Sequence, residues 1–337
     1  MEEKKLDRNS IIGFLLIFGI LIWIMYQNQP DPKVVAAEKA KKELVEKAAK
    51  AQELAQKSIE KAAVAVATTG DSTQLAQLQK NLGNFAYSAT LPSAKADFTT
   101  IENEVVKLKI ANKGGFIVEA VLKQHEKFKK GSGKLVELIK DNNTNLNITL
   151  QTADNRALNT KDMYFEPSLS KVGEDQILSM KLKAGANEYL EYKYILKPNK
   201  YMIGFDVRSQ GLNKVLNTSK PLDLQWNMKT YRNEKSISYE NRYTEVYFEH
   251  QDGKIDYVGQ GESKEENAEN TTFVAFKQHF FSTILMTDKP FATSKLVSNN
   301  LVKDEAIDTV FTKQFTADIP LSFTNGELDY KMNWYLG

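Results

Sequence analysis

The sequence has no cysteine and only three histidines among its 337 residues. Without cysteine the chain can form no disulfide bond, no cysteine-ligated metal site and no thiol nucleophile. His125, His250 and His279 are far apart, and none belongs to a motif with metal-ligand spacing. The sequence also lacks a nucleophile elbow and a phosphate-binding loop. We therefore predict no catalytic residue, no bound cofactor and no metal site.

The chain also lacks a strong charge of either sign. Its 45 Lys and Arg residues nearly balance 43 Asp and Glu residues, which leaves a formal net charge of +2. This balance gives no overall signal for nucleic-acid binding. The length is sufficient for a membrane segment together with one large domain or two modest ones.

Long apolar runs are scarce, and the longest is the uncharged stretch Ile11–Tyr26. A buried core helix is disfavoured because the following segment is rich in Lys, Glu and Ala. A cleaved signal peptide is the main alternative, with an apolar region of about 7–15 residues. The nearest site of small residues, 35–37, lies beyond Pro30 and Pro32, which is a poor cleavage geometry.

A retained membrane anchor fits this run best. Its sixteen residues would rise about 24 Å as a helix, somewhat less than the ~30 Å hydrocarbon core. Trp23 and Tyr26 suit one membrane interface, and Arg8 can reach the other. Lysines lie on both sides of the run, so the positive-inside rule does not fix its orientation.

Residues 27–97 read as a helical linker. Between Glu38 and Ala67 the composition is dominated by Ala, Lys and Glu, with Glu-to-Lys pairs four residues apart that support a helix. We interpret this part as a solvated spacer. Leucines at helical spacing predict a second, short helix over Gln74–Asn84, and we expect it to dock on the domain that follows.

From residue 98 onward the hydrophobic period changes to two, which predicts half-buried strands of antiparallel sheets. Three hairpins are expected, with turns at Lys197–Lys200, Asp252–Gly253 and Asn325–Gly326. The segments with the clearest alternation are Val106–Ile110, Leu146–Leu150, Leu178–Leu182, Leu190–Leu196, Tyr201–Val207 and Leu328–Trp334.

Phe273–Met286 is nearly continuous in apolar residues, which predicts a central strand buried on both faces. The preceding charged segment, Glu262–Asn270, is expected to be a loop. No amphipathic pattern of helix length is evident between residues 98 and 337. The fold class is therefore mainly β, a large antiparallel sandwich of two packed sheets.

Few residues of this β-rich region suggest chemistry. His279 lies within the apolar segment, where a hydrogen-bonded histidine in the core or at its rim is expected more often than a catalytic one. His250 follows a predicted strand, and His125 lies in a polar stretch. Gly114–Gly115 reads as a turn rather than a phosphate cradle. Aromatic residues at period two indicate cross-strand core pairs more often than sugar-stacking surfaces.

The order of several segments resembles the N-terminal portion of a YidC-type bacterial membrane protein insertase. Asp7–Ser10 precedes the apolar run directly, and the linker segment Phe85–Ala94 is similar to the version found in Bacteroidetes. The other segments that carry the resemblance are Val105–Val121, Tyr192–Val207, Phe273–Met286 and Asn333–Gly337.

The resemblance implies a β-supersandwich with a galactose mutarotase-like shape. It implies that residues 1–10 are cytoplasmic, that residues 11–26 span the bacterial inner membrane, and that the linker 27–97 and the sandwich 98–337 are periplasmic. The family continues into a five-helix insertase core, so we expect this chain to be a fragment or a truncated product.

The resemblance further implies a non-enzymatic role in inserting and folding inner-membrane proteins, alone or with the Sec translocon. The expected partners are inner-membrane lipid, nascent membrane proteins and Sec translocon components, and no nucleic acid is expected. In this interpretation the β domain is an interaction module.

Two other functions remain open on the residues alone. The sandwich and its aromatic residues would also suit a membrane-tethered carbohydrate-binding or mutarotase-like periplasmic protein. Mutarotase-like catalysis would need a histidine and a carboxylate that converge in one cleft. A purely structural envelope protein, with the Ala/Lys/Glu helix as its scaffold, is the third possibility.

Overall fold

The computed structural model describes residues 72–337, apart from 251–252, 260 and 262. The predicted anchor, residues 11–26, and the predicted spacer helix, residues 38–67, lie outside the described residues. Within the described part, no helix is both long enough and apolar enough to cross a membrane.

The described chain begins with a short helical segment that packs on the β-rich region. It consists of α3 (Ser72–Leu82), the 3-10 turn η1 (Gly83–Phe85) and α4 (Ala86–Ala89). Leu78, Leu82 and Phe85 are buried and belong to the same hydrophobic core as the strands. The predicted second helix and its docking are thus confirmed.

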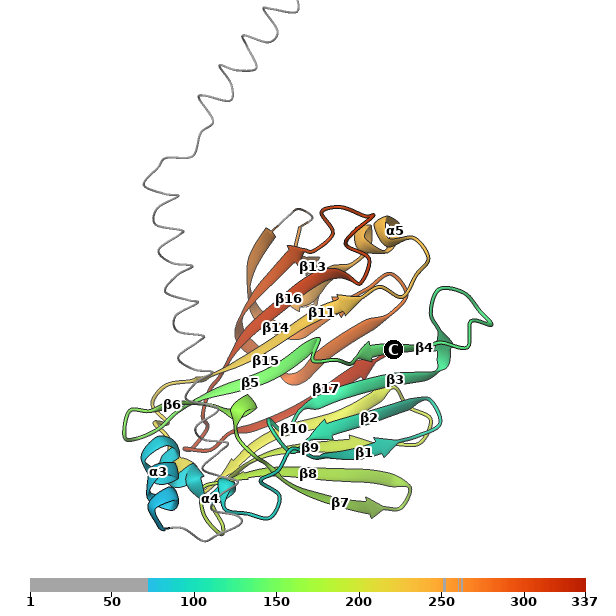
Figure 1. Ribbon diagram of the computed structural model, residues 1–337. Coiled ribbons are helices and arrows are strands. Elements are labelled where there is room, and N and C mark those ends of the chain that lie inside the picture. Colours follow the sequence, from blue (N-terminus) through green and yellow to red (C-terminus); the bar gives the residue numbers. More distant parts are fainter. Residues whose placement is uncertain (1–71, 251–252, 260, 262) are drawn as a thin grey trace, which may run out of the picture. The chain divides into compact units, whose positions relative to one another are not determined.

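Two antiparallel sheets follow, and Figure 1 shows the smaller one lying across one face of the larger. The small sheet has the order β1-β2-β3-β4, formed by β1 (Phe98–Glu102), β2 (Val106–Ala111), β3 (Ile117–Glu126) and β4 (Leu135–Ile139). Their inward side chains and those of the large sheet form one continuous core.

The large sheet contains the other thirteen strands of the described region. Its main path runs β6-β5-β11-β16-β15-β17-β10-β9-β8-β7, while β14 pairs with β15 and β12, and β12 with β13. The bounds are β5 (Thr144–Gln151), β6 (Ala157–Asn159), β7 (Glu166–Val172), β8 (Asp175–Lys183), β9 (Tyr189–Leu196), β10 (Met202–Gln210), β11 (Leu222–Tyr231), β12 (Glu245–His250), β13 (Lys254–Tyr257), β14 (Ser263–Lys277), β15 (Ser282–Asn300), β16 (Phe311–Leu321) and β17 (Asp329–Leu336).

The remaining helical elements are short. They are η2 (Thr160–Asp162), η3 (Leu212–Lys214) and α5 (Ile237–Arg242). The prediction of a mainly β, antiparallel sandwich of two sheets is confirmed, and α5 is a single short helix that the hydrophobic period does not reveal.

The predicted alternation is also confirmed in detail. The inward residues of β2, β5 and β8 are essentially inaccessible to solvent, while their neighbours along each strand are half-exposed or polar. The hairpin of β9 and β10 pairs from Ile203–Leu196 to Gln210–Tyr189, with Asn199 at a positive φ of 52° in the turn. β12 and β13 form the second predicted hairpin.

A ladder of aromatic rings fills the centre of the core. Trp226 on β11 stacks on Phe276 of β14 with the ring centroids 3.7 Å apart, and it meets Trp334 of β17 edge-on at 4.8 Å. Pairs of this kind add about 0.5–1.5 kcal/mol beyond the burial of area. Further rings continue the ladder on either side through Phe205, Tyr194, Tyr192, Phe165 and Phe315.

The prediction of one central strand over Phe273–Met286 is wrong. This segment folds back on itself, because Phe273 pairs with Met286 and Lys277 pairs with Ser282 in the hairpin of β14 and β15. The amide of Gln278 donates to the carbonyl of Phe281 at 2.7 Å and closes the turn. The polar pair Gln278–His279 in the middle of the run marks the reversal.

The charged segment Glu262–Asn270 is not the expected loop, because β14 already begins at Ser263. Backbone pairing with β15, from Ser263–Asn299 to Glu269–Thr293, holds this half of the strand. All its side chains except that of Ala268 point into solvent. Charged side chains on such an exposed strand oppose pairing with another chain.

The third predicted hairpin is also wrong. Asn325 and Gly326 do form a tight turn, with φ values of 53° and 79°, and the flanking residues Thr324 and Glu327 form an isolated bridge. The strands β16 and β17 do not pair with each other, because each pairs with a different part of β15, β17 with Thr283–Thr287 and β16 with Lys295–Asn300. A two-residue turn sets the local reversal but not which strands pair.

An ion pair with a buried carboxylate lies on the hairpin of β9 and β10. Glu191 is 2% exposed, faces Arg208 in the strand register, and accepts hydrogen bonds from Arg208 and from the hydroxyl of Ser179. Burial raises the pKa of this carboxyl, but the hydrogen bonds and the positive charges of Arg208 and Lys181 outweigh burial and hold the pKa below its usual value.

We expect Glu191→Gln to lower the free energy of unfolding by about 1–2 kcal/mol at neutral pH, since Arg208 is half-exposed and can regain water. Because the folded pKa lies below the unfolded one, this contribution is present above pH 4.5 and is lost as the pH falls through the folded pKa. Urea denaturation of the full chain in mild detergent measures both effects.

The matched control is Glu265→Gln, which removes an exposed pair with Lys295 and should cost no more than about 0.5 kcal/mol. An equal loss of stability in both variants, or a difference between wild type and Glu191→Gln that persists at low pH, would contradict the role given to this pair.

Candidate functional site

The three histidines do not converge on one centre. His250 ends β12, and its Nε2 lies 3.8 Å from an Asp256 oxygen, too far for a hydrogen bond. His125 lies next to the last residue of β3, and its Nε2 is 3.2 Å from the hydroxyl of Tyr201. His279 lies in the turn between β14 and β15. The expectation that His279 is a hydrogen-bonded histidine at the rim is confirmed.

His279 forms the one short histidine–carboxylate contact of the described region. Its Nδ1 lies 2.7 Å from Oε1 of Glu234. The imidazole stacks on Tyr243 at 5.0 Å and meets Tyr239 edge-on at 5.1 Å. The neighbouring Phe280 ring lies at 4.0 Å, so three rings cover the imidazole and leave its side chain 20% exposed.

Glu240 of α5 joins this turn to the segment after β11. Its carboxylate accepts the backbone amides of Asn233 and Glu234 at 3.0 Å, and Gln278 donates to it at 3.4 Å. Burial raises the pKa of the Glu240 carboxyl even though the two amides act in the opposite direction. Glu240 therefore positions α5 and the turn, and it is almost fully buried.

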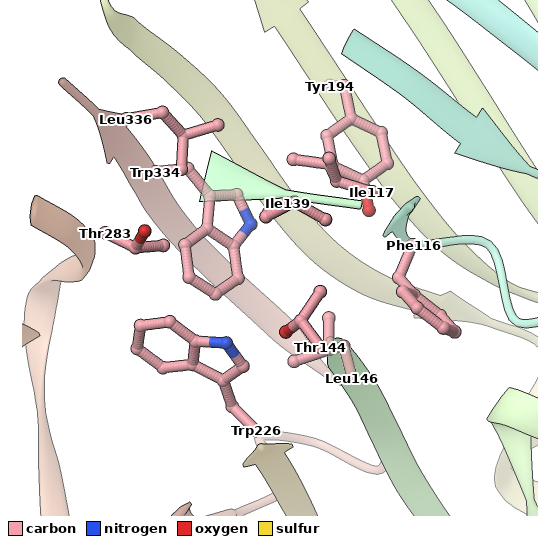
Figure 2. Close-up of a pocket in the computed structure, with 10 residues that line it drawn as sticks. All are labelled: Phe116, Ile117, Ile139, Thr144, Leu146, Tyr194, Trp226, Thr283, Trp334 and Leu336. Carbon is pink, nitrogen blue, oxygen red and sulfur yellow. The ribbon is translucent and has the colours of Figure 1, made fainter. Parts of the chain in front are cut away.

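A small cavity lies between the two sheets, next to the aromatic ladder. Its volume is about 20 Å³, close to the ~10–15 Å³ that one water molecule needs. Figure 2 shows Trp226 and Trp334 on one side, with Tyr194, Ile117 and Ile139 on the other. No histidine or carboxylate lines it, so this cavity suits a single water rather than a sugar.

The predicted turn at Gly114–Gly115 is confirmed, and both glycines have a positive φ, of 84° and 68°. A Cβ on Gly115 would lie 2.8 Å from the ring of Phe165, and the Gly115 carbonyl accepts the hydroxyl of Tyr194. The doublet thus allows close packing of the small sheet on the large one. Among the described residues no cluster of acidic or histidine side chains could hold a metal ion.

Together these features define a large antiparallel β-sandwich domain whose polar clusters position turns. The family described as the YidC periplasmic domain matches residues 99–325. The chain belongs to the YidC periplasmic domain family, as the resemblance predicts.

Curated relatives match almost the whole chain. The membrane protein insertase YidC of Parabacteroides distasonis is 31% identical over 340 residues, which cover 98% of this chain and 52% of the relative. The insertase of Phocaeicola vulgatus is 30% identical over 338 residues, which cover 98% of this chain and 50% of the relative. The chain thus spans about half the length of these relatives.

Solved structures show a more distant likeness. A galactose mutarotase-like protein from Lactobacillus casei has a TM-score of 0.41 at 12% identity, over 72% of this chain and 100% of that one. A galactose mutarotase related enzyme from Lactobacillus acidophilus has a TM-score of 0.41 at 9% identity, over 72% and 97%. At these values the likeness says nothing about what the chain binds.

The burial of Glu240 predicts how the stability of the domain depends on pH. Its folded pKa is raised above the unfolded value, so the folded state binds the proton more tightly and stability falls as the pH rises from 4.5 through the folded pKa. Glu240→Gln cannot titrate and keeps one acceptor oxygen. Urea denaturation should therefore show wild type losing stability relative to Glu240→Gln as the pH rises.

Removal of the Glu240 carboxylate should lower the free energy of unfolding at every pH. Glu240→Ala leaves the amides of Asn233 and Glu234 without their partner, and we expect it to cost at least about 2 kcal/mol. The exposed Glu269→Ala is the control and should change stability by less than about 0.5 kcal/mol. Similar losses in the two variants would argue against the role of Glu240.

Proposed function

We propose that this chain is the N-terminal and periplasmic portion of an insertase that assists the insertion and folding of inner-membrane proteins, alone or with the Sec translocon. The supporting observation is the family match over residues 99–325 together with similarity to insertases over 98% of the chain. Sheltering the polar groups of an incoming segment saves several kcal/mol for each group that would otherwise be left in lipid.

The proposed arrangement has four parts. Residues 1–10 are cytoplasmic, residues 11–26 form the inner-membrane anchor, residues 27–97 form the linker, and residues 98–337 form the periplasmic β domain. The β domain acts as an interaction module for nascent membrane proteins and Sec components. Its non-enzymatic character is supported by the separation of the three histidines, of which only His279 lies at hydrogen-bond distance from a carboxylate in the described region.

The topology can be tested by cysteine labelling because the chain has no cysteine of its own. In intact spheroplasts a charged, impermeant maleimide should label Ser219→Cys, since Ser219 is exposed on the β domain. Ser10→Cys should react only after lysis, because the reagent cannot cross the hydrocarbon core. Labelling of Ser10→Cys alone in intact spheroplasts would reverse the proposed topology.

The parent activity has a separate test in the source genome. We expect the reading frame to continue past codon 337 into several apolar, membrane-spanning segments that supply the insertase core. A stop codon at that point, with no apolar spans encoded after it, would contradict an insertase function for the product.

A further inference from the structure

Exposed aromatic residues gather at one end of the β domain. We call this the aromatic end and define it as residues 125–135, 231–243 and 277–282. It carries Phe128, Tyr239, Tyr243 and Phe280, which are 43%, 47%, 37% and 70% exposed. Figure 1 shows α5, the loop between β3 and β4, and the carboxyl-terminal end of β17 on the same side of the sandwich.

Direct contacts join the three segments into one surface. The amide of Phe128 donates to the carbonyl of Asn233 at 2.6 Å, and the guanidinium of Arg232 lies 5.9 Å from the Phe128 ring. The contact of His279 with Glu234 links the turn between β14 and β15 to the same segment. The aromatic end is therefore continuous from the loop at Phe128 to Phe280.

The loop between β3 and β4 is held in a defined shape. The carboxylate of Glu126 accepts the amides of Gly131, Ser132 and Gly133 and so closes the loop around itself. Phe128 has a φ of 70°, which is unfavourable for an aromatic residue. A strained conformation fixed in an exposed loop is a feature found at ligand-contacting sites.

Several lysine side chains of the aromatic end are exposed to solvent. Lys129, Lys130, Lys134 and Lys235 are exposed, and none lies within 4.0 Å of an acidic group in the described region. The acidic residues are engaged internally, since amides bind Glu126 and Glu240, and His279 contacts Glu234. The surface therefore presents unpaired positive charge beside apolar rings.

An acidic loop bounds this surface on one side. Asp304 and Asp308 lie between β15 and β16, where their carboxylates accept amides of Lys303, Asp304 and Ala306 within the same loop. The Val310 carbonyl accepts the amide of Arg232 and joins this loop to the aromatic end. The cationic area is thus limited to the loop between β3 and β4 and the segment around α5.

We propose that the aromatic end docks on the anionic headgroups of the bilayer that holds the anchor. Exposed lysines near a bilayer are attracted to anionic lipid, and aromatic rings favour the level of the headgroups. The mixture of unpaired lysines and exposed rings complements such a surface in charge and polarity. This inference rests on the proposed anchor at residues 11–26 and leaves the insertase function unaffected if it fails.

Proteoliposomes of the full chain test the proposal with an environment-sensitive nitrobenzoxadiazole label on a single cysteine. Ser238→Cys places the label on α5, at the aromatic end. Ser219→Cys places a matched label just before β11, at the opposite end of that ten-residue strand. The bilayers are phosphatidylcholine and phosphatidylglycerol in a three-to-one ratio, or phosphatidylcholine alone, each with a lipid carrying a doxyl quencher.

We expect the doxyl lipid to quench the label at Ser238→Cys in the anionic bilayer at least about twofold more than the label at Ser219→Cys. Reversal of Lys129 and Lys130 to Glu should lower the docking equilibrium at least about tenfold and remove this difference. Phe280→Ser should also weaken docking and reduce the quenching at Ser238→Cys. Reversal of Lys214 and Lys220 to Glu, exposed lysines at the opposite end, is the matched charge control and should change nothing.

Equal quenching at the two labelled positions in anionic bilayers would overturn the proposal. So would quenching at Ser238→Cys that persists in phosphatidylcholine alone or in the Lys129 and Lys130 double variant. A blue shift at Ser238→Cys without quenching, dependent on protein concentration, would assign the surface to a second protein copy instead. Failure of the chain to enter liposomes at all would count against the anchor, and hence against the proposed topology.

Discussion

The nineteen-residue strand β15 holds the large sheet together. Its first residues, Thr283–Thr287, pair with β17, and its last residues, Lys295–Asn300, pair with β16. The strands reached through β16 and those reached through β17 do not pair with each other anywhere else along the path of the sheet. Backbone hydrogen bonds of this one strand therefore join β6-β5-β11-β16 to β17-β10-β9-β8-β7 within the described region.

The aromatic ladder crosses the same junction. Trp226 belongs to the β11 side, Trp334 to the β17 side, and Phe276 to β14, the hairpin partner of β15. Phe276 and Trp334 lie beside the part of β15 that pairs with β17, and Trp226 reaches them from β11. The stacked rings stabilise the junction between the two groups of strands, where backbone pairing with β15 extends over only a few residues. The core around the rings is closely packed, since the cavity beside them has a volume of only about 20 Å³.

The correct predictions from the sequence concern features set by residues that are close together along the chain. The hairpin of β9 and β10 follows from alternation on both strands and a Pro-Asn turn, all within neighbouring residues. The hairpin of β14 and β15 is hard to predict because its strands are apolar near the turn and charged further along, and only the polar pair Gln278–His279 interrupts the apolar run. The position of Glu240 could not be predicted, since its partners Asn233 and Gln278 meet only in the folded chain.

The misread hairpin also determines what lies at the aromatic end. Had Phe273–Met286 been one straight strand, His279 and Phe280 would lie in the sheet, shielded by neighbouring strands. The reversal at Gln278 instead carries both residues to the tip of the domain, where Glu234 and Glu240 fix the turn against α5. Glu126, Glu234 and Glu240 hold the loop and the turn in place. Within the described region, Lys129, Lys130 and Lys134 of the adjacent loop have no acidic group within 4.0 Å, whereas Lys127 pairs with Glu137. The reversal at Gln278 is therefore the reason why exposed rings and exposed lysines lie together at this end.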